Sequence, residues 1–469
     1  MKKIANAKKI HLIGIKGVGM TAFACCLKDL NIKISGTDLK KEFITDAVLK
    51  ENNITWQKGF DKKNINNQDF VIATGSDHGG PQNPEAQAAK RKNIPYLTHG
   101  EALGRLMSEK IGISVCGVGG KTTVSAMLAT ILEKGNFKPS YAVGVAKIFP
   151  LGNPGRWQKG KYFIAEADEY ATSKNYDHRP RFSWQNPRYI IATNIEHDHP
   201  DIYPTLAKTN KTFLKFFQKI PSNGLLIING DHINNKRVLN KFSGPYQTVG
   251  FQSHNNWQIK NIILAVGKTQ FTLYKKDKKI GAVNLAVPGR HNIFDSALAA
   301  VMAIQLNTPF KVIQEALKEF RGTRRRFEYI KTKNNLHFYD DYAHHPSQLK
   351  AVLRAARHWF NKNKKIIVIF QPHTFSRTKK FFNQFAASFS TADRIFLIPI
   401  YASEREKNKN NVSSQKLAQK IKTQPQMENR VSFVSNKTAL IKMIKKVAHK
   451  EDIIFTIGAG DVWKLHRLF

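Results

Sequence analysis

The chain has 469 residues, which is too long for one ordinary hydrophobic core, and we expect roughly two to four domains. Hydrophobic residues make up 41% of the sequence, a composition typical of a globular protein and not of a disordered one. The formal net charge is +41. The lysines are spread along the chain without a long basic block or an RNA-binding aromatic signature, so compositional bias explains the charge better than a nucleic-acid partner.

The three cysteines are Cys25, Cys26 and Cys116, and they have no CxxC spacing. An odd number without a framework indicates a reducing compartment and no structural metal. The lysines at the N-terminus resemble the start of a signal peptide, but the apolar run after them is short and breaks at Gly14. No stretch approaches the roughly 18 apolar residues of a membrane span. We therefore expect a cytoplasmic protein with no membrane partner.

Residues 9–105 alternate predicted strands and helices, and a glycine loop follows the first strand. The loop residues are Gly17, Val18, Gly19, Met20 and Thr21. The second strand ends at Asp38, and this pattern fits the fingerprint in which a glycine turn and a helix start hold a pyrophosphate. The third strand ends near Ser76, although ordinary turn residues explain Gly75 and Ser76 about as well. The pattern predicts a pyrophosphate-bearing ligand and does not identify NAD.

A second glycine loop lies between an apolar run and a pattern of helical period. It consists of Gly117, Val118, Gly119, Gly120, Lys121, Thr122 and Thr123. Glycines let backbone N–H groups close around phosphate oxygens, the lysine supplies a positive charge, and a threonine hydroxyl can hold Mg²⁺. The spacing departs from the usual P-loop, because Val115 stands where that motif has its first glycine. The loop still predicts ATP and Mg²⁺ as cofactors.

Two further predicted strands in this region run into polar clusters. The strand 162–165 leads to Glu166-Ala-Asp-Glu169, and the strand 188–193 leads to a segment that contains His199. Either cluster alone is explained equally well as a solvated loop. Because the carboxyl ends of parallel strands meet at one edge of a sheet, the two clusters together predict a metal–phosphate site. Carboxylates, with one histidine, suit Mg²⁺.

From about residue 321 the chain changes character. A cationic cluster, residues 321–327, precedes three apolar strands whose ends carry polar or glycine residues, and we predict a third α/β unit. The polar residues of this region include Asp341 and His344, which follow residues 337–339, and His373 and Arg377, which follow the strand 366–370. Residues 407–411 read as a loop. Upstream, His291 and Asn292 begin a helix, where capping alone would explain them.

The sequence therefore predicts an α/β fold with three domains. Residues 1–105 form an N-terminal Rossmann-like domain, residues 106–321 a central P-loop ATPase domain with a mostly parallel sheet, and residues 322–469 a C-terminal Rossmann-like α/β domain.

In chain order, these motifs resemble those of the Mur ligase family, the ATP-dependent amino-acid ligases that build the peptidoglycan precursor. The motifs are Gly117 to Thr123, Glu166-Ala-Asp-Glu169, Asn194-Ile-Glu196-x-Asp198-His199, Gly289-Arg-His291-Asn292, Arg325-Arg326-Phe327, Asp340-Asp341-Tyr342-x-His344-His345-Pro346 and Gln371-Pro-His373-x-Phe-x-Arg377-Thr378. The resemblance covers nearly the whole chain and favours the alanine-adding branch. It implies a carbon–nitrogen ligase that activates UDP-N-acetylmuramate as an acyl phosphate with ATP and joins it to L-alanine.

The resemblance also implies roles for individual residues. The uridine diphosphate sugar would be contacted by Gly17, Val18, Gly19, Met20 and Thr21, with Asp38 and Ser76 nearby. Mg²⁺ would be held by Thr122, Glu166 and His199. The ATP nucleotide would contact the second glycine loop and His291, Asn292, Arg325 and Asp341. His373 and Arg377 would face the substrate, and the catalytic residues would be Lys121, His199, His344 and Arg377.

Two departures from the family pattern leave room for a different reading. Val118 and Gly119 stand where the family has threonine and histidine, which would also fit a degenerate, non-catalytic member. Tyr170, residues 177–182 and residues 199–203 look more like the recycling branch, which attaches L-alanyl-γ-D-glutamyl-meso-diaminopimelate. An NAD-dependent dehydrogenase would account for the first glycine loop, and a nucleic-acid-binding ATPase would account for the charge. We expect no nucleic acid and a monomer or weak homodimer.

Overall fold

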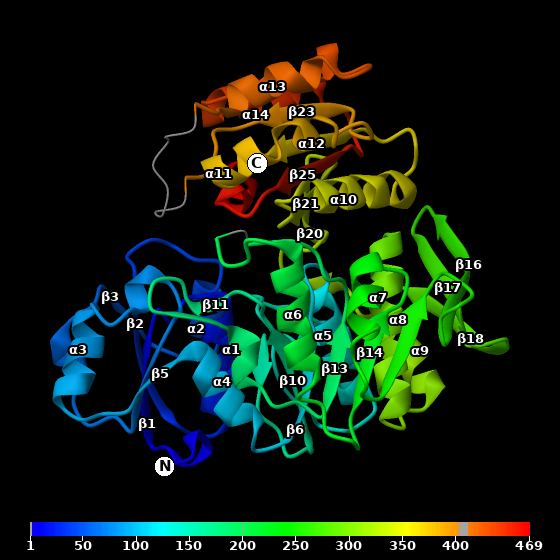
Figure 1. Ribbon diagram of the computed structural model, residues 1–469. Coiled ribbons are helices and arrows are strands. Elements are labelled where there is room, and N and C mark those ends of the chain that lie inside the picture. Colours follow the sequence, from blue (N-terminus) through cyan, green and yellow to red (C-terminus); the bar gives the residue numbers. More distant parts are fainter. Residues whose placement is uncertain (1, 200, 403–410) are drawn as a thin grey trace. The chain divides into compact units, whose positions relative to one another are not determined.

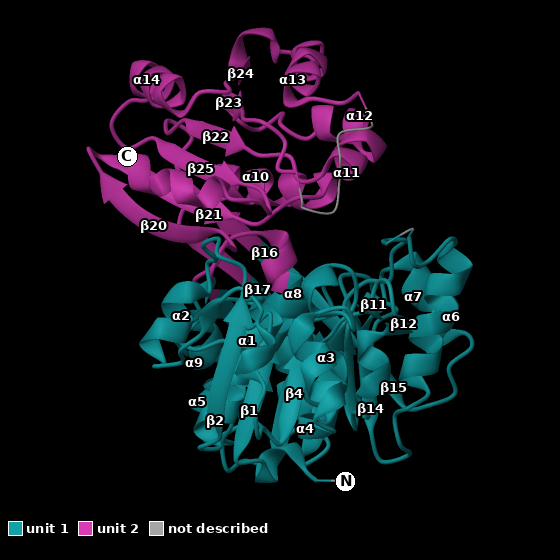
Figure 2. Ribbon diagram, turned by 90° about the vertical axis from the view of Figure 1, so that its left-hand side faces the viewer, with its two compact units in different colours: residues 1–262, 271–284, 294–323 teal, residues 263–270, 285–293, 324–469 magenta. Residues whose placement is uncertain are grey.

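The computed structural model describes residues 2–199, 201–402 and 411–469, which form two compact units (Figure 2). Unit 1 comprises residues 1–262, 271–284 and 294–323, and unit 2 comprises residues 263–270, 285–293 and 324–469. Except for its last residue, the loop predicted at 407–411 lies outside the described residues. Three main sheets with helices between their strands make up the fold, so the predicted α/β class is confirmed (Figure 1).

The first sheet of unit 1 is entirely parallel and has the strand order β3-β2-β1-β4-β5. Its strands are β1 (Lys9–Ile13), β2 (Lys33–Asp38), β3 (Gln57–Lys58), β4 (Phe70–Ala73) and β5 (Tyr96–Thr98). Its helices are α1 (Val18–Asp29), α2 (Asp46–Glu51), α3 (Pro84–Arg91) and α4 (His99–Met107). Strand β4 is a continuous apolar run because both faces of a parallel sheet are covered by helices.

The second sheet has ten strands in the order β18-β17-β16-β15-β14-β13-β6-β10-β7-β9. In chain order they are β6 (Ile111–Cys116), β7 (Ser140–Ala142), β9 (Gly155–Arg156), β10 (Tyr162–Ala167), β13 (Tyr189–Ala192), β14 (Leu225–Asn229), β15 (Tyr246–Gly250), β16 (Trp257–Ala265), β17 (Lys268–Lys275) and β18 (Lys278–Leu285). From β7 to β16 the neighbours pair in parallel. The expected mostly parallel central sheet is therefore confirmed.

Helices and two short pairs of strands complete this region. The helices are α5 (Lys121–Lys134), α6 (Leu206–Phe217), α7 (Ile233–Leu239), α8 (Arg290–Gln305) and α9 (Phe310–Glu319). The antiparallel pairs are β11 (Ala171–Ser173) with β12 (Asp177–Pro180), and β8 (Ile148–Phe149) with β19 (Gly322–Thr323). Short 3-10 helices are η1 (Ile4–Asn6), η2 (Lys62–Asn64), η3 (Asp77–Gly79) and η4 (Arg181–Trp184).

The first and second sheets share one hydrophobic core. Phe163 of β10 belongs to the same buried cluster as Ile10 of β1 and Phe23 of α1. Helix α1 approaches β9 so closely that a Cβ on Gly155 would lie 1.9 Å from the carbonyl oxygen of Ala22. The predicted boundary after residue 105 falls inside α4, and the three domain boundaries stay a prediction.

Unit 2 is built on a six-stranded sheet with the order β20-β21-β25-β22-β23-β24. Its strands are β20 (Glu328–Lys333), β21 (Leu336–Asp341), β22 (Ile366–Phe370), β23 (Arg394–Leu397), β24 (Val431–Phe433) and β25 (Ile453–Ile457), and β20 alone among these pairs antiparallel. Its helices are α10 (Pro346–Trp359), α11 (Phe375–Lys380), α12 (Phe382–Ala386), α13 (Ser414–Lys422) and α14 (Lys437–Val447), with η5 (Glu428–Arg430) and η6 (Val462–Leu468). Alternate residues of β22 enter two separate cores, because helices cover both faces.

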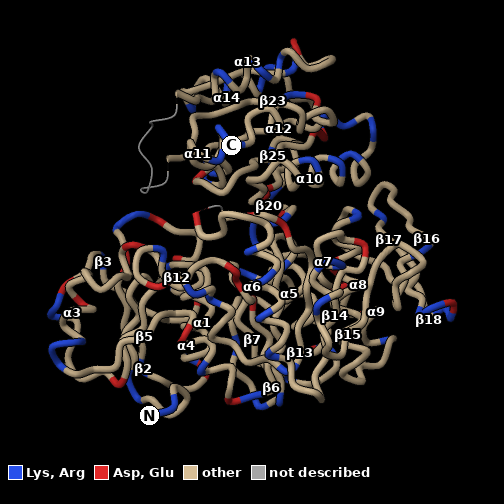
Figure 3. The backbone as a smooth tube through the Cα atoms, viewed as in Figure 1, with Lys and Arg blue, Asp and Glu red and all other residues tan. Residues whose placement is uncertain are grey.

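The described residues include no helix long and apolar enough to cross a membrane. Lysine and arginine are distributed over the elements of both units, as Figure 3 shows. Cys25, Cys26 and Cys116 are buried free thiols.

Candidate active site

Three adjacent strands of the second sheet end at one edge and deliver the polar segments that the sequence singled out. Strands β13, β6 and β10 are neighbours and run parallel, so their carboxyl ends meet (Figure 1). Strand β6 continues into the second glycine loop, β10 into the acidic motif, and β13 into the segment around His199. This edge carries the first group of candidate site residues.

Hydrogen bonds from the segment that follows β13 fix the backbone of the second glycine loop. The backbone N–H of Val118 donates to the carbonyl of Asn194 at 2.9 Å, and the N–H of Gly119 donates to its Oδ1 at 3.0 Å. The hydroxyl of Thr193 donates to the carbonyl of Gly119 at 2.6 Å. Helix α5 begins at Lys121, within this segment, so its unpaired N–H groups and positive end form a phosphate cradle. Sequence reasoning did not assign Thr193 or Asn194 to the site, although Asn194 begins one of the family motifs.

Glycine is required at some loop positions and not at others. Gly117 has a φ of 119°, and a Cβ there would lie 2.1 Å from Oγ1 of Thr193. Gly120 has a φ of 86°, and its Cβ would lie 2.6 Å from Oδ1 of Asp295. At Gly119, where the family has histidine, the nearest atom to a Cβ is 3.7 Å away. A side chain at 119 would therefore begin in ordinary van der Waals contact with Oδ1 of Asn194, so the backbone of the loop does not require glycine there.

Lys121 is surrounded by carboxylates. Its Nζ lies 2.7 Å from Oε2 of Glu169, and the two side chains are 15% and 3% exposed. Burial lowers the pKa of Lys121, but Glu169, Asp168 and Glu166 outweigh burial and raise the pKa above its ordinary value. Lys121 is thus a fixed positive charge. Burial raises the pKa of Glu169 even though Lys121 opposes the shift. Glu169 is therefore the ion-pair partner of Lys121. From the sequence alone, Glu169 had no predicted role beyond its motif.

Thr122 and Glu166 are brought together beside the loop. Glu166 accepts hydrogen bonds from the hydroxyl of Thr122 and, at 2.7 Å, from the backbone N–H of Gly144. Burial raises the pKa of Glu166. The described residues contain no cluster of three or more His, Cys, Asp or Glu placed to hold a metal. Because Mg²⁺ is usually bound by one or two carboxylates together with phosphates and water, this pair of oxygen donors fits it.

His199 lies beside the acidic motif. Its ring packs on Tyr170 with centroids 4.6 Å apart, and its backbone N–H donates to Oδ1 of Asp198 at 2.7 Å. Burial raises the pKa of Asp168, but Arg181, Lys121 and His199 outweigh burial and lower the pKa to about 2. His199 is thus part of the charge cluster, with contacts to Tyr170 and Asp198. Its predicted role as a metal ligand stays a prediction.

The first glycine loop also lies where three adjacent strands, β2, β1 and β4, end. Several predicted binding residues here hold the loop itself. Asp38 accepts from the backbone N–H of Lys16 and of Leu39, both at 2.7 Å, and the hydroxyl of Thr21 donates to the carbonyl of Ile15 at 3.0 Å. Met20 is buried, whereas Val18 is 40% exposed. The groups left for a ligand are the helix start at residues 17–19 and Ser76.

In unit 2, the neighbouring strands β21, β25 and β22 end together. The rings of His344 and His373 have centroids 6.2 Å apart, and His373 stacks on Tyr401. Burial, helped by the charge of Arg377, holds the pKa of His344 well below its ordinary value. Nδ1 of His344 lies 3.0 Å from the carbonyl of Tyr342, so it donates and leaves Nε2 as an acceptor in the neutral ring.

The other predicted residues of unit 2 have protein partners. Arg325 is buried, and its guanidinium donates to Oδ2 of Asp340 at 2.7 Å and to the carbonyls of Gly458 and Gly460 at 2.5 and 3.2 Å. Asp341 accepts from the backbone N–H of Phe327 at 2.7 Å, and burial raises the pKa of Asp341 to about 6.

His291 and Asn292 lie at the start of α8. The side-chain amide of Asn292 donates to the carbonyl of Pro288 at 2.7 Å, a local contact of the kind that a purely structural role requires. The predicted nucleotide contacts of His291, Asn292, Arg325 and Asp341 stay predictions.

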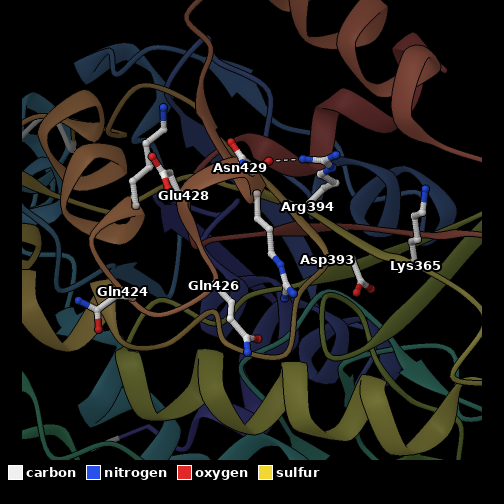
Figure 4. A pocket seen from close by; sticks show the side chains of 9 residues that line it. Lys365, Asp393, Arg394, Gln424, Gln426, Glu428 and Asn429 are labelled. Atoms are coloured by element: carbon white, nitrogen blue, oxygen red, sulfur yellow. Dashed lines mark hydrogen bonds between the residues drawn. The ribbon is translucent and has the colours of Figure 1, made fainter.

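A pocket of about 540 Å³ lies at the opposite edge of the unit 2 sheet (Figure 4). It is lined by residues at the amino ends of β22, β23 and β24, including Lys365, Asp393 and Arg430. Arg394 donates across it to the backbone carbonyl of Asn429. None of the predicted site residues lines this pocket.

The described architecture matches one protein family along the chain. The family models match in order: "Mur ligase family, catalytic domain" over residues 9–111, "Mur ligase middle domain" over residues 115–304, and "Mur ligase, glutamate ligase domain" over residues 325–460. The chain belongs to the Mur ligase family. It is therefore an ATP-dependent ligase that forms a carbon–nitrogen bond, as predicted, and the dehydrogenase and nucleic-acid-binding interpretations lose their support.

Within this family, the chain is similar to proteins named UDP-N-acetylmuramate–L-alanine ligase. One from Geobacter sp. (strain M21) is 33% identical, covering 98% of this chain and 96% of the relative. One from Dictyoglomus turgidum is 35% identical, covering 98% and 96%. The fold matches the UDP-N-acetylmuramate-alanine ligase of Thermotoga maritima, with a TM-score of 0.81, 24% identity and 98% of each chain covered. It also matches a murein peptide ligase from Psychrobacter arcticus, with a TM-score of 0.71, 22% identity and 98% of each chain covered.

Proposed function

We propose that this protein joins L-alanine to the lactyl carboxylate of UDP-N-acetylmuramate, with ATP converted to ADP and phosphate. The observation that carries this proposal is the similarity, over nearly the full length of both chains, to several ligases named for that reaction. The reaction needs charge neutralisation and positioning more than a protein nucleophile. A site made of a lysine, carboxylates and a glycine loop is suited to that task.

In the first step, a carboxylate oxygen of the sugar nucleotide forms a bond to the γ-phosphorus of ATP while the bond to ADP breaks. The second glycine loop cradles the phosphates, and Lys121 exchanges its contact with Glu169 for a phosphate oxygen. Thr122 and Glu166, with His199 as a further candidate, would hold Mg²⁺. When bound, Mg²⁺ neutralises the charge on the transferred phosphoryl group.

In the second step, the amine of alanine attacks the acyl carbonyl and phosphate leaves. The neutral ring of His344 offers Nε2 to accept the proton that the ammonium must lose. Arg377 and His373 contact the acyl phosphate or the incoming amino acid, where a guanidinium suits phosphate or carboxylate oxygens.

The remaining binding roles follow the same proposal. The first glycine loop, residues 17–21, binds the uridine diphosphate part through backbone N–H groups, with Asp38 and Ser76 nearby. The adenine nucleotide contacts the segments that contain His291, Asn292, Arg325 and Asp341. We place the activity in the cytoplasm, because the three cysteines are unpaired thiols, and we expect a monomer or weak homodimer.

A second candidate is the recycling reaction, in which L-alanyl-γ-D-glutamyl-meso-diaminopimelate replaces alanine. Tyr170 and residues 177–182 favour it locally. The full-length sequence relatives favour the alanine reaction, so the tripeptide is the competing amine to test.

Phosphate release with ATP, Mg²⁺ and UDP-N-acetylmuramate separates the candidates. L-Alanine should support turnover, and the tripeptide, glycine and serine should support much less. If phosphate release were faster with the tripeptide than with L-alanine, the recycling reaction would be the function of the protein. No release with any amine would contradict both candidates.

A further inference from the structure

An antiparallel hairpin in unit 1 connects the two sets of strand ends. The hairpin β11–β12 and the following η4, residues 171–184, come directly after the acidic motif of the second sheet. They also contact the segment that follows β4 of the first sheet: a Cβ on Gly75 would lie 2.1 Å from the carbonyl oxygen of Thr172, and Asn175 donates to Oδ1 of Asp77 at 3.0 Å. The segment therefore lies against the loop that follows β4, within reach of both glycine-loop regions.

Arg181 is the residue of this segment with contacts on both sides. Its Nη1 donates to Oδ2 of Asp168 at 2.8 Å, next in sequence to the carboxylate that holds Lys121. On the other side, a Cβ on Gly75 would lie 3.2 Å from Nη2, so the guanidinium lies against the loop after β4. The Arg181 side chain is 31% exposed, which leaves it open to a ligand.

His99 gives an independent sign of a ligand in the same place. Its ring lies against the first glycine loop, where a Cβ on Gly19 would be 3.0 Å from Cε1. Among the described residues, Nε2 of His99 is buried and has no hydrogen-bond partner. An unsatisfied buried polar atom is costly, so it indicates a group that is satisfied when a ligand binds.

We infer that Arg181 binds the carboxylate of the sugar-nucleotide substrate and positions one of its oxygens for attack on the γ-phosphate. This inference rests on the proposed function, because that reaction needs a carboxylate held between a sugar-nucleotide site and an ATP site. A guanidinium presents parallel N–H groups that match a carboxylate, and Arg181 uses one nitrogen on Asp168. The Asp168 contact fixes the direction in which the remaining N–H groups point.

The neighbouring Arg179 provides a matched control on the same hairpin. Its guanidinium folds back onto Asp177, with contacts of 2.9 and 2.8 Å, and lies over the Trp184 ring with 4.2 Å between Cζ and the centroid. It is 63% exposed. Both arginines have the same charge and lie two residues apart, but only Arg181 contacts the acidic motif.

The test measures by calorimetry the binding of UDP-N-acetylmuramate and of UDP-N-acetylglucosamine, which lacks the lactyl group that carries the carboxylate. Arg181→Gln should weaken binding of the first by about 10- to 100-fold, the loss expected for hydrogen bonds to a charged group, and leave the second unchanged. Arg181→Lys should fall between wild type and Arg181→Gln. Arg179→Gln should bind both ligands as the wild type does.

Equal weakening of both ligands, or no weakening in a folded Arg181→Gln protein, would overturn the inference. A general structural role would lower the melting temperature and affect both ligands, so melting curves accompany each titration. If the wild-type protein binds and turns over UDP-N-acetylmuramate, and Arg181→Gln binds it equally well, only this inference is contradicted. A wild-type protein that binds neither ligand contradicts the proposed function first.

Discussion

The two glycine loops of unit 1 have the same backbone plan and different surroundings. In each, a central strand with parallel neighbours on both sides is followed by a glycine with positive φ, Gly14 at 77° and Gly117 at 119°, and a helix begins a few residues later. Each loop therefore offers N–H groups and the positive end of a helix to an anion.

The lysines show the difference. Lys16, directly before the first loop, is 2% exposed, donates to the carbonyl of Lys41 at 2.5 Å, and lies 3.4 Å from Asp46. Lys121 in the second loop begins the helix and faces the carboxylates of the acidic motif. One lysine stabilises its loop, and the other is placed to exchange a carboxylate for a phosphate. Glycine geometry determines where a phosphate can lie, while the side chains from neighbouring strands determine whether chemistry follows.

The largest expected effect concerns the lysine of the second loop. Lys121→Ala should lower the rate of phosphate release roughly 100- to 1,000-fold, the loss typical for removal of one preorganised electrostatic contact. Binding of UDP-N-acetylmuramate at the first loop should persist. The control is Lys134→Ala at the far end of the same helix, where Lys134 pairs with Glu319 on the surface. Full turnover by a folded Lys121→Ala protein would remove the lysine from the ATP site.

Arg377 lies in neither loop, so its loss should slow the acyl-transfer step without weakening the binding of ATP or UDP-N-acetylmuramate. Arg377→Ala should lower kcat roughly 10- to 100-fold, which corresponds to hydrogen bonds to a charged oxygen. The KM values for ATP and for UDP-N-acetylmuramate should stay within a small factor of wild type. Steady-state kinetics with each substrate varied in turn measure this split. Unchanged kcat would exclude Arg377 from the reacting groups.

Alanine substitutions at the loop glycines should divide by ligand. Gly117→Ala should raise the KM for ATP roughly 10-fold, because its Cβ would lie 2.1 Å from Oγ1 of Thr193 at a φ unsuited to alanine. Gly14→Ala should instead raise the KM for UDP-N-acetylmuramate, because its Cβ would meet Cγ2 of Thr74 at 2.5 Å. Gly119→Ala, with no atom closer than 3.7 Å, is the control and should resemble wild type. If Gly117→Ala and Gly14→Ala raised the same KM, the division of labour between the loops would be wrong.

The smallest expected effect is a pH dependence of stability that comes from Asp168, a residue of the acidic motif beside the second loop. The pKa of Asp168 is lowered from 3.8 to about 2, because Arg181, Lys121 and His199 outweigh the opposing effect of burial. A carboxyl group with a lowered folded-state pKa contributes stability above its unfolded pKa and loses it as the pH falls through the folded value. Asp168→Asn should therefore lower the melting temperature at pH 7 by roughly 2 to 4 °C. The difference from wild type should shrink between about pH 4 and about pH 2.

Asp277→Asn, at an exposed turn between β17 and β18, is the control for this measurement. Its melting temperature should follow that of the wild type at each pH. A difference between Asp168→Asn and wild type that grows on acidification would contradict the assigned direction of the Asp168 shift.

Most of the fold could be predicted because its signals are local. Apolar runs followed by glycine loops and helical periods predicted the strand–loop–helix units at Gly17 and Lys121, and both are present. The fusion of the first two sheets around Phe163 was not predictable, since contacts between sheets leave no periodic pattern in the sequence.

The sequence by itself determined the family, the α/β class and the segments that would gather at strand ends, because motif spacing and hydrophobic period are properties of short stretches. Only the tertiary structure decided which side chains of those segments face a ligand. In the folded protein, Lys121 forms an ion pair with Glu169, and Arg325 is buried in an ion pair with Asp340. Asp38 and Thr21 form hydrogen bonds with the backbone of their own loop region. These outcomes depend on which strands are neighbours and on which polar groups lose water on folding, and neither is written in the local pattern.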